Sequence, residues 1–491
     1  MIKLSNLISE DINFKINIEN LFIKGISSDS RKLEKGFLFA SLTENSDLYI
    51  KNAIKKGAVA LLLNKKDYKK YLGIKDIGII AVKNPREFYG ILCSNFYNLK
   101  FNHIVAVTGT NGKTSVVWMV NSFWNKIGIK SAFIGTLGVF DNNKIYKTDL
   151  TTPSIDQIYL NLMELQKKNF KNVIIEASSH GIHQNRIGGL NISIAVITSL
   201  SRDHLDYHKN FTNYKKAKLR LFETIPSNGL AIINDSIKEY KEFIKASKNN
   251  NLKIVTVGEN KTSDWYYKIK HYKDNRQEIE VINKNKKRNF FTNIIGKFQI
   301  NNLITSMAIL NETGVSFKTL IENIDKVSVP PGRLEYIGKT KESTEIFIDY
   351  AHTPDALKNV LLSVRPYVKK NLCIVFGCGG DRDKGKRSIM GKIAYKHADI
   401  IYVTDDNPRN EDAKKIRRHI IANCPNAIEV ANRKNAITKA IHHCKKGDIL
   451  LILGKGHEET QEINNNFKHF SDKEEVYKII GSDNSRNIRE L

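Results

Sequence analysis

The run Gly109-Thr-Asn-Gly-Lys-Thr-Ser115 constrains this chain more than any other feature of its sequence. It lies between a strand-like segment, residues 103–107, and a segment with apolar residues at helical spacing, 116–124. Backbone N–H groups at such a turn, together with the positive end of the helix, bind phosphate oxygens. Lys113 would neutralise the β- and γ-phosphates and the Thr114 hydroxyl would bind Mg²⁺. The sequence predicts a nucleotide-binding βα unit with a short loop, since Val107 replaces the usual glycine.

Strand-like apolar runs alternate with helical patterns through the rest of the chain, which is typical of a mostly parallel sheet covered by helices on both faces. The predicted strands after the loop cover residues 173–176, 194–198, 230–233, 254–257, 346–349, 372–376, 400–403 and 448–453. We therefore predict an α/β fold. A length of 491 residues fits about three domains.

Two breaks in the pattern place the domain boundaries. A polar linker, 98–102, follows a predicted helix at 85–97, and the Pro330-Pro331-Gly332 cluster interrupts the alternation later. We predict an N-terminal α/β domain at 1–100, a central P-loop-type domain with a mostly parallel sheet at 101–328, and a Rossmann-like domain at 329–491. The Lys/Asn-rich stretch 283–289 is expected to be a hairpin tip or loop.

Charge and cysteine usage argue against several classes of function. Lys and Arg number 78 against 51 Asp and Glu, giving a formal charge of +27, but no basic arm or arginine-rich tract gathers them. We interpret the Lys and Arg residues as solvent-exposed side chains spread over the protein surface rather than as a nucleic-acid-binding surface. The five cysteines form no C-x-x-C pair, so neither a disulfide framework nor a zinc site is predicted. Because apolar runs are only strand-length, we expect a cytoplasmic protein without membrane insertion.

Potential metal ligands follow two of the predicted strands. Glu176-Ala-Ser-Ser-His180 ends one strand and Asp203-His-Leu-Asp-Tyr-His208 follows the next. In an open α/β sheet both would lie at the carboxyl edge, where ligands bind. Phosphoryl transfer brings anions together and needs cations between them. Taken separately these segments read as a helix cap and a surface turn, but together they favour a metal site.

The run Thr108-Gly-Thr-Asn-Gly-Lys-Thr114 resembles the ATP loop of the Mur ligase family and of the related folylpolyglutamate synthases. The resemblance implies ATP-driven amide bond formation, in which a substrate carboxylate attacks the γ-phosphoryl group and an amine displaces phosphate from the acyl phosphate. His352 is a further candidate beside the nucleotide. The ATP-binding residues that the resemblance implies are Gly109, Thr110, Asn111, Gly112, Lys113, Thr114, Ser115, Asn302, Arg333 and Asp349.

The same resemblance extends to a helix-like segment, Tyr214-Lys-Lys-Ala-Lys218, whose lysine is carbamylated in the family. A lysine that carries CO₂ is an anion able to orient a metal ion, whereas an ammonium would repel it. Without the resemblance, Lys218 would be interpreted as a solvent-exposed lysine on an amphipathic helix. The resemblance implies Lys113, Glu176, His204 and Lys218 as catalytic residues, with Thr114, Glu176, His204 and N6-carboxylysine at 218 as Mg²⁺ ligands.

Further segments resemble the family members that add the third residue of a UDP-muramoyl stem peptide. Arginine suits carboxylate groups there because its planar fork donates two N–H bonds. The implied contacts to UDP-N-acetylmuramoyl-L-alanyl-D-glutamate are Ser28, Ser30, Thr151, Thr152, Ser178, Gln184 and Arg186. The implied contacts to meso-diaminopimelate are Arg382, Asp406, Asn407, Pro408, Arg409, Gly454 and Glu458.

The expected activity is therefore ATP- and Mg²⁺-dependent ligation of meso-diaminopimelate to a UDP-muramoyl dipeptide, a step of peptidoglycan precursor synthesis. We expect the enzyme to be a monomer. The motif Asp406-Asn-Pro-Arg409 favours diaminopimelate over lysine, since its arginine would pair with the carboxylate that lysine lacks. A lysine-adding ligase or a folylpolyglutamate synthase is the alternative within enzymes. A basic nucleotide switch or nucleic-acid binder is the alternative from another class.

Overall fold

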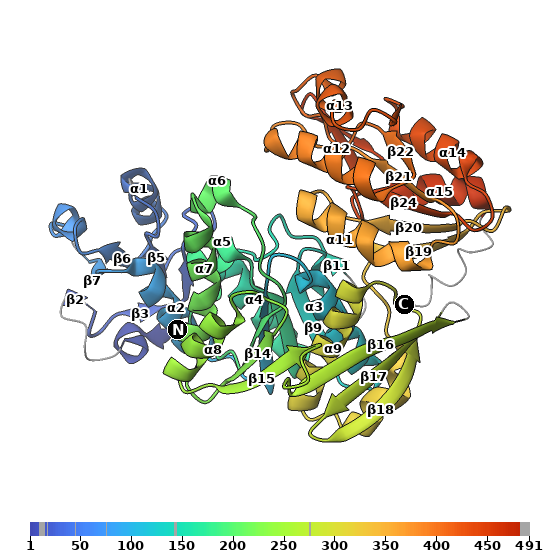
Figure 1. The fold of residues 1–491 in the computed structure, drawn as a ribbon. Coiled ribbons are helices and arrows are strands. Elements are labelled where there is room, and N and C mark those ends of the chain that lie inside the picture. Colours follow the sequence, from blue (N-terminus) through green and yellow to red (C-terminus); the bar gives the residue numbers. More distant parts are fainter. Residues whose placement is uncertain are drawn as a thin grey trace. The chain divides into compact units, whose positions relative to one another are not determined.

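The computed structural model describes residues 1–8, 15–16, 18–44, 46–74, 76–141, 145–273 and 276–481. The chain divides into two compact units, Met1–Val257 with Met307–Val315, and Gly258–Ser306 with Ser316–Leu491. Figure 1 shows the elements of both units. The α/β fold class is confirmed, whereas the boundaries placed at residues 100 and 328 stay a prediction.

The first unit begins with a small sheet of order β2-β7-β6-β5-β4, in which the last four strands are parallel. A predicted helix, α2, follows it and starts where the Asn84 side chain accepts from the Glu87 N–H. Asn98 ends α2 in the left-handed conformation, with φ of 44°. The elements are β1 (Ile2–Lys3), β2 (Lys15–Ile16), β3 (Phe22–Ile23), β4 (Gly25–Ser27), β5 (Phe37–Ala40), α1 (Asp47–Lys55), β6 (Ala60–Asn64), β7 (Gly78–Val82) and α2 (Pro85–Tyr97).

A larger sheet in the same unit carries the phosphate loop. Its parallel strands run in the order β9-β12-β8-β13-β14-β15, with β10 and β11 antiparallel at one edge. Glu176 pairs in register with Val107, so the ends of β12 and β8 meet at one edge of the sheet. The elements are β8 (His103–Thr108), α3 (Lys113–Lys126), β9 (Ser131–Gly135), β10 (Gly138–Phe140), β11 (Ile145–Tyr146), α4 (Ile155–Lys167), β12 (Asn172–Glu176), α5 (Ser179–His183), β13 (Ile194–Ile197), α6 (Leu205–His208), α7 (Phe211–Thr224), β14 (Leu230–Asn234), α8 (Tyr240–Asn249) and β15 (Lys253–Gly258).

The second unit contains three antiparallel strands, β16 to β18, and a six-stranded sheet of order β19-β20-β24-β21-β22-β23. The six-stranded sheet is parallel except for its edge strand β19. The elements are β16 (Trp265–Lys273), β17 (Arg276–Asn283), β18 (Lys286–Thr292), α9 (Lys297–Glu312), α10 (Phe317–Asn323), β19 (Arg333–Lys339), β20 (Glu345–Asp349), α11 (Pro354–Val364), β21 (Leu372–Phe376), α12 (Gly385–His397), β22 (Ile400–Val403), α13 (Ala413–Ile421), β23 (Ile428–Glu429), α14 (Arg433–His443), β24 (Ile449–Leu453), β25 (Thr460–Ile463), β26 (Asn466–His469) and α15 (Asp472–Ile480).

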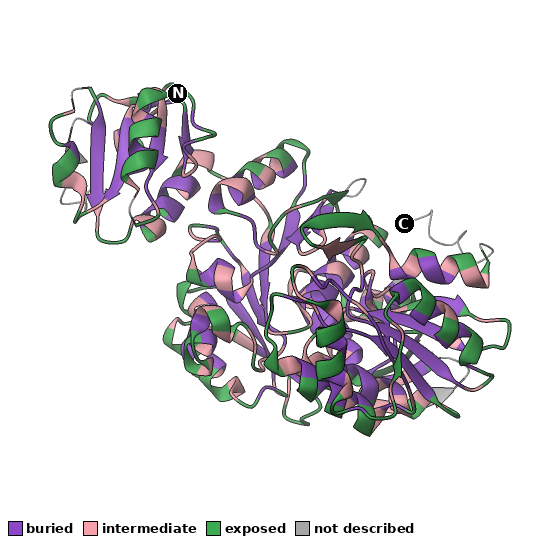
Figure 2. Ribbon diagram, turned by 90° about the horizontal axis from the view of Figure 1, so that it is seen from above, coloured by how far each residue is buried: buried purple, intermediate pink, exposed green. Residues whose placement is uncertain are grey.

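Burial explains the apolar runs of the central strands. Every residue of β12, β21 and β24 is buried, as expected of parallel strands covered on both faces. Figure 2 shows the central strands of the sheets in purple and the exposed surface mainly on helices, loops and outer strands. All five cysteines are free and buried. The described part of the chain has no helix of sufficient length and apolarity to cross a bilayer.

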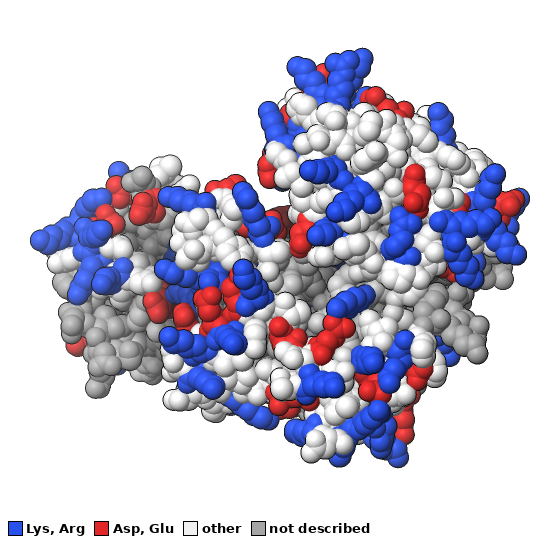
Figure 3. Space-filling model, viewed as in Figure 1, with Lys and Arg blue, Asp and Glu red and all other residues white. Residues whose placement is uncertain are grey.

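Basic and acidic side chains are mixed on the face in Figure 3, where Lys and Arg lie beside Asp and Glu over most elements. The predicted hairpin tip is confirmed only at residues 284–285, between β17 and β18, because Asn283 ends β17 and residues 286–289 belong to β18. The antiparallel strands around it were not predicted, because their alternating polar residues lack the apolar runs used to find the parallel strands.

Candidate active site

The phosphate loop has the backbone that its glycines permit. Gly109 and Gly112 adopt φ of 154° and 87°, and a Cβ at Gly109 would lie 2.0 Å from the Thr198 hydroxyl oxygen. The loop is fixed further by Thr110 N–H, which donates to Ser199 O at 2.9 Å. The Lys113 ammonium donates to Gly109 O at 2.8 Å and to Thr110 O at 2.9 Å. The lysine therefore lies against the loop at the start of α3.

Glu176 lies beside this loop with its carboxylate buried. Thr114 Oγ1 donates to Glu176 Oε2 at 3.1 Å, which joins two of the predicted metal ligands. Thr136 adds two further donors, its N–H to Oε1 at 2.9 Å and its hydroxyl to Oε2 at 3.1 Å. Gly135 has to lack a side chain, since a Cβ there would lie 2.3 Å from Glu176 Oε1. Thr136 was not predicted from the sequence, because it lies outside the phosphate loop and the two segments with potential metal ligands.

The Glu176 carboxylate fits a divalent cation. Only 1% of the residue is exposed, and its described partners are all neutral hydroxyl and N–H groups. A buried carboxylate is costly unless a cation pairs with it. Mg²⁺ is bound through one or two carboxylates plus phosphates and water, so a large cluster of protein ligands is not required. Within the described ranges, no group of three or more His, Cys, Asp and Glu is arranged around a common metal position.

Lys218 lies close enough to His204 to affect it electrostatically, and Tyr214 connects Lys218 to the phosphate loop. The Lys218 ammonium is 4.6 Å from the centre of the Tyr214 ring, and the Tyr214 hydroxyl is 2.9 Å from the Thr110 hydroxyl. Burial, with a smaller effect of Lys113, holds the pKa of Lys218 well below its usual range. Burial also lowers the pKa of His204, which favours the neutral imidazole needed for a metal ligand.

His208 is buried in a cluster of histidine and tyrosine rings and makes the fold sensitive to acid. Its Nε2 is 3.0 Å from the Ser179 hydroxyl oxygen. Burial, with smaller effects from His180 and His183, lowers the pKa of His208 from 6.5 to about 4. The folded state therefore resists protonation of His208, and its contribution to stability is present above pH 6.5 and lost as the pH falls towards 4.

We expect His208→Asn to reduce the fall in Tm between pH 7 and pH 5. Thermal unfolding at a series of pH values measures this slope, with the exposed His419 on α13 changed to Asn as the matched control. An unchanged slope in His208→Asn would show that the other groups of the cluster account for the acid sensitivity.

The residues predicted to hold the muramoyl dipeptide form one hydrogen-bonded group. Thr152 Oγ1 donates to Ser178 Oγ at 2.9 Å, and Arg186 Nη1 donates to Thr152 O at 2.7 Å. Gln184 Oε1 accepts from Arg186 Nη2 at 2.7 Å, and the Gln184 amide nitrogen donates to the Tyr207 hydroxyl at 3.0 Å. Thr151 joins the same region, since its hydroxyl is 3.1 Å from that of Thr136. Tyr207 belongs to the segment from Asp203 to His208, but it was not predicted as a site residue.

Ser28 is held by a residue that the sequence did not reveal. The Asp156 carboxylate accepts from the Ser28 N–H at 3.2 Å, from the Ser28 hydroxyl and from the Tyr89 hydroxyl. Asp156 lies in the first turn of α4, 128 residues away from Ser28. Ser30, two residues after Ser28, is buried. No local spacing could have indicated the link to Asp156.

In the second unit, the remaining predicted ATP contacts are connected. Asn302 Nδ2 donates to Gln299 Oε1 at 3.0 Å, and Gln299 Nε2 donates to Arg333 O at 2.8 Å. The Arg333 guanidinium lies 4.5 Å from the Tyr350 ring centre. Burial raises the pKa of Asp349 to about 6, although Arg333 and two backbone N–H groups oppose the shift. His352 is exposed, and its Nδ1 is 2.7 Å from Tyr350 O.

The residues predicted to bind the amino acid come together at the ends of β21, β22 and β24. Asn407 Nδ2 donates to Glu458 Oε2 at 3.1 Å, and a Cβ at Gly454 would lie 2.7 Å from Asp406 Oδ2. Lys455 was missed by sequence reasoning. It is fully buried, and its ammonium donates to Asn407 Oδ1 and Glu458 Oε2, both at 3.2 Å.

Two loops of this cluster pack closely on each other. Gly380 N–H donates to Asn407 O at 2.8 Å, and a Cβ at Gly380 would lie 1.9 Å from Pro408 O. Arg409 Nη1 lies 2.9 Å from the position of a Cβ on Gly379. Arg382, from the same glycine loop, is exposed. The contacts thus bring Asn407, Arg409, Gly454 and Glu458 into one cluster.

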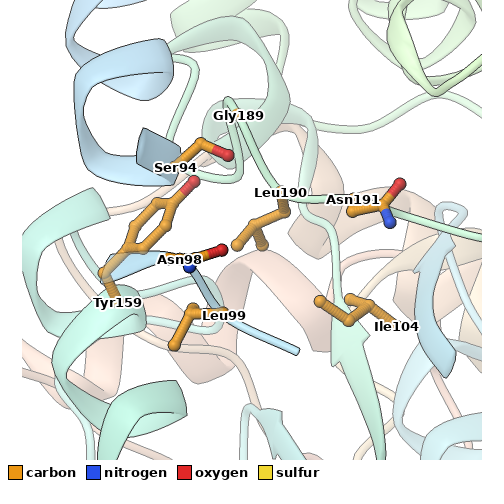
Figure 4. Close-up of a pocket in the computed structure, with 8 residues that line it drawn as sticks. All are labelled: Ser94, Asn98, Leu99, Ile104, Tyr159, Gly189, Leu190 and Asn191. Carbon is orange, nitrogen blue, oxygen red and sulfur yellow. The ribbon is translucent and has the colours of Figure 1, made fainter. Parts of the chain in front are cut away.

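A separate pocket of about 70 Å³ lies between α2, α4 and the segment before β13 (Figure 4). Ser94, Tyr159 and Asn191 contribute polar groups to its wall, and Leu99 and Leu190 contribute apolar ones. Its volume suits a few water molecules and is far too small for a nucleotide. None of the predicted site residues lines it, so it is not part of the candidate active site.

The α/β sheets, the phosphate loop and the buried carboxylate beside it define a nucleotide-binding α/β enzyme. The family model described as the Mur ligase middle domain matches residues 107–310, and the model described as the Mur ligase, glutamate ligase domain matches residues 332–456. The chain belongs to the Mur ligase family. This confirms the resemblance seen in the loop motif.

Individual relatives match nearly the whole chain. A relative from Agrobacterium fabrum, named UDP-N-acetylmuramoyl-L-alanyl-D-glutamate–2,6-diaminopimelate ligase, is 39% identical over 92% of this chain and 92% of its own. A relative from Rickettsia montanensis with the same name is 40% identical over 94% of this chain and 98% of its own. A solved structure of a ligase of that name is 31% identical, with a TM-score of 0.74 and coverage of 98% of both chains.

Proposed function

We propose that this protein is a cytoplasmic ligase that uses ATP to join meso-diaminopimelate to the D-glutamate carboxylate of UDP-N-acetylmuramoyl-L-alanyl-D-glutamate. The product would be a peptidoglycan precursor, and we propose that the enzyme acts as a monomer. The observation that carries the proposal is the cluster of Arg409, Asn407 and Glu458 in the second unit. Its charges complement a substrate with two carboxylates and two amino groups, and the relatives' shared name supports the same substrate pair.

Activation of the carboxylate would take place at the phosphate loop. The loop N–H groups and Lys113 would hold the β- and γ-phosphates of ATP in line with the incoming substrate carboxylate. Attack on the γ-phosphoryl group forms an acyl phosphate and releases ADP. The free amine of diaminopimelate then attacks the acyl carbon, and phosphate leaves as the amide bond forms.

Thr114, Glu176 and His204 would hold Mg²⁺ at this site. The support is the buried Glu176 carboxylate with only neutral described partners, together with the Thr114 hydroxyl 3.1 Å away. The ion would supply charge neutralisation between the phosphate oxygens and the attacking carboxylate. Tyr214 and Thr110 would keep the loop in place while the nucleotide binds, because their hydroxyls are 2.9 Å apart.

Lys218 is proposed to react with CO₂ and to act as a carboxylate. The residue is only 1% exposed and its depressed pKa favours the uncharged amine, whose nitrogen lone pair can attack CO₂. The product is an N-carboxylysine, with one proton released to solvent. An anion at this position would be favourable beside Lys113 and a metal ion, whereas a second ammonium would be repelled.

The muramoyl-dipeptide would bind along the group formed by Thr152, Ser178, Gln184 and Arg186. Arg186 is suited to a substrate carboxylate because its side chain is only partly exposed and already anchored by Gln184 and Thr152 O. Ser28, anchored by Asp156, would contact the uridine nucleotide. Both contacts belong to the first unit.

Arg409→Ala is expected to lower kcat/KM for meso-diaminopimelate by about 100-fold, because a desolvated arginine–carboxylate pair contributes several kcal/mol, roughly 2–5. Phosphate release from ATP with UDP-muramoyl dipeptide and either meso-diaminopimelate or L-lysine measures the effect. The exposed Arg418 on α13, changed to Ala, is the matched control. Equal use of lysine by the wild-type protein would contradict the proposed substrate, and no phosphate release with either amino acid would contradict the ligase reaction.

A further inference from the structure

Arg409 is held in an unusual backbone conformation by the hairpin of β25 and β26. Its φ is 52°, a value that arginine rarely adopts. Its N–H donates to Glu462 O at 3.1 Å, and its carbonyl accepts from the Asn464 N–H at 2.9 Å. These two bonds fix the direction in which the Arg409 side chain leaves the loop. Glu462 lies 53 residues further along the chain from Arg409, so no motif of the loop itself encodes this contact.

The Arg409 guanidinium is held as well. Its Nε lies 2.9 Å from Glu462 Oε2, and Nη1 donates to Gly380 O at 2.9 Å. Both side chains of the ion pair are about four-fifths buried, with 19% and 20% exposed. A guanidinium has five N–H groups, and the described contacts use two of them. Enough donors remain for a bidentate contact with one further carboxylate.

We propose that Glu462 is a positioning residue that selects for the diamino diacid by fixing the Arg409 guanidinium towards the second carboxylate of the substrate. The inference rests on the proposed function. An unanchored arginine would lose the freedom of several rotatable bonds when substrate binds, which weakens binding. The Glu462 contact fixes those bonds before the substrate arrives.

Charge alone would argue against a glutamate at this position. The Glu462 carboxylate partly cancels the attraction between Arg409 and an incoming carboxylate. Glu462 therefore favours binding of the diamino diacid only if the gain from fixing the Arg409 side chain is larger than this loss of attraction. The two effects can be separated, because a glutamine at 462 can still accept from Arg409 Nε–H but carries no charge.

A merely structural role for Glu462 is also distinguishable. The hairpin is attached to the Asp406–Arg409 loop by contacts that do not use the Glu462 side chain. Gln461 Nε2 donates to Asp406 O at 2.6 Å, the Glu462 N–H donates to Asn407 Oδ1 at 3.1 Å, and Lys455 Nζ donates to Thr460 O at 2.6 Å. Truncation of the Glu462 side chain leaves these three contacts in place.

The test compares Glu462→Ala and Glu462→Gln in the full-length protein by steady-state phosphate release. Glu462→Ala is expected to raise KM for meso-diaminopimelate by about tenfold or more while kcat changes by less than about threefold. Glu462→Gln is expected to restore KM to within about threefold of wild type. The kcat/KM for L-lysine, the probe that lacks the second carboxylate, should change in neither variant. Glu474→Gln is the matched control, since Glu474 pairs with His469 on the exposed side of the hairpin.

Three results would overturn the inference. An unchanged or lower KM in Glu462→Ala would mean that anchoring of Arg409 contributes nothing to selection. Equal defects in the Ala and Gln variants would assign the effect to charge. A rise in KM for ATP and for the UDP-muramoyl dipeptide, together with a lower Tm, would make Glu462 only a structural residue. Absence of diaminopimelate-dependent phosphate release in the wild-type protein would instead refute the proposed function itself.

Discussion

Replacement of Lys218 by alanine is expected to lower the rate of ATP-dependent ligation by about 10²–10³-fold, the loss seen when one preorganised electrostatic group is removed from an active site. The reason is the position of its amine, buried against the Tyr214 ring and close to Lys113. As a carbamate, Lys218 would supply an anion beside Lys113 that could orient the metal ion. The rate of phosphate release with all three substrates present is the measurement.

Chemical rescue separates this role from a packing role. A short carboxylic acid such as acetate should partly restore activity to Lys218→Ala, because it can occupy the vacated volume and supply the lost anion. Lys216→Ala, on the exposed side of α7, is the control and should retain wild-type activity. Removal of dissolved CO₂ and bicarbonate should slow the wild-type enzyme, and activity that is indifferent to CO₂ would contradict carbamylation of Lys218.

The second large effect concerns stability. Asp472→Ala is expected to lower the free energy of unfolding by about 3–5 kcal/mol, since it leaves a buried arginine without its anion. Arg433 and Asp472 are both fully buried, and Arg433 Nε and Nη2 each lie 2.7 Å from an Asp472 oxygen. Arg433 Nη2 also donates to Leu453 O at 2.9 Å. The pair thus ties the first turns of α14 and α15 to the end of β24.

Urea denaturation of the variants measures this loss. Lys478→Ala removes one of two exposed lysines that pair with Glu475 on the same helix, α15, and should change stability by less than about 1 kcal/mol because Lys434 still pairs with Glu475. The double variant Arg433→Met with Asp472→Leu should recover most of the stability, because it removes both charges together. A loss under about 1 kcal/mol in Asp472→Ala would contradict the assigned role of the pair.

Most of the parallel core was predictable from sequence because its strands are covered on both faces, but β9, which is fully buried and pairs in parallel with β12, was not predicted. That burial gives uninterrupted apolar runs such as those of β21 and β24. The strands β16 to β18 lack this signal, since exposed charged residues interrupt them. Only the turn between β17 and β18 was predicted, from its Lys and Asn residues.

The parts of the candidate site that consist of consecutive residues in the sequence were predictable. The loop from Gly109 to Ser115 is an example, because a phosphate group is held by consecutive N–H groups. The burial of Lys218 was not predicted from its helix, although Tyr214, Ala217 and Leu221 lie on the same face of α7. The partners Asp156 and Glu462 had no local signal, because each reaches its target across a large separation in sequence. Tertiary structure alone brings such pairs together.

The residues proposed to choose the amino acid all lie between Gly379 and the β25–β26 hairpin in the second unit, whereas the phosphate loop and Glu176 lie in the first. Under the proposed function, the residues that would select the incoming amine lie apart from the phosphate loop, although the proposed ATP contacts Asn302, Arg333 and Asp349 share their unit. If the proposed roles hold, substitutions in a few loops of the second unit would change the amino acid that is added, and the phosphate loop and Glu176 would need no change. Grafting these loops between relatives is accordingly a practical route to ligases that accept unnatural amino acids.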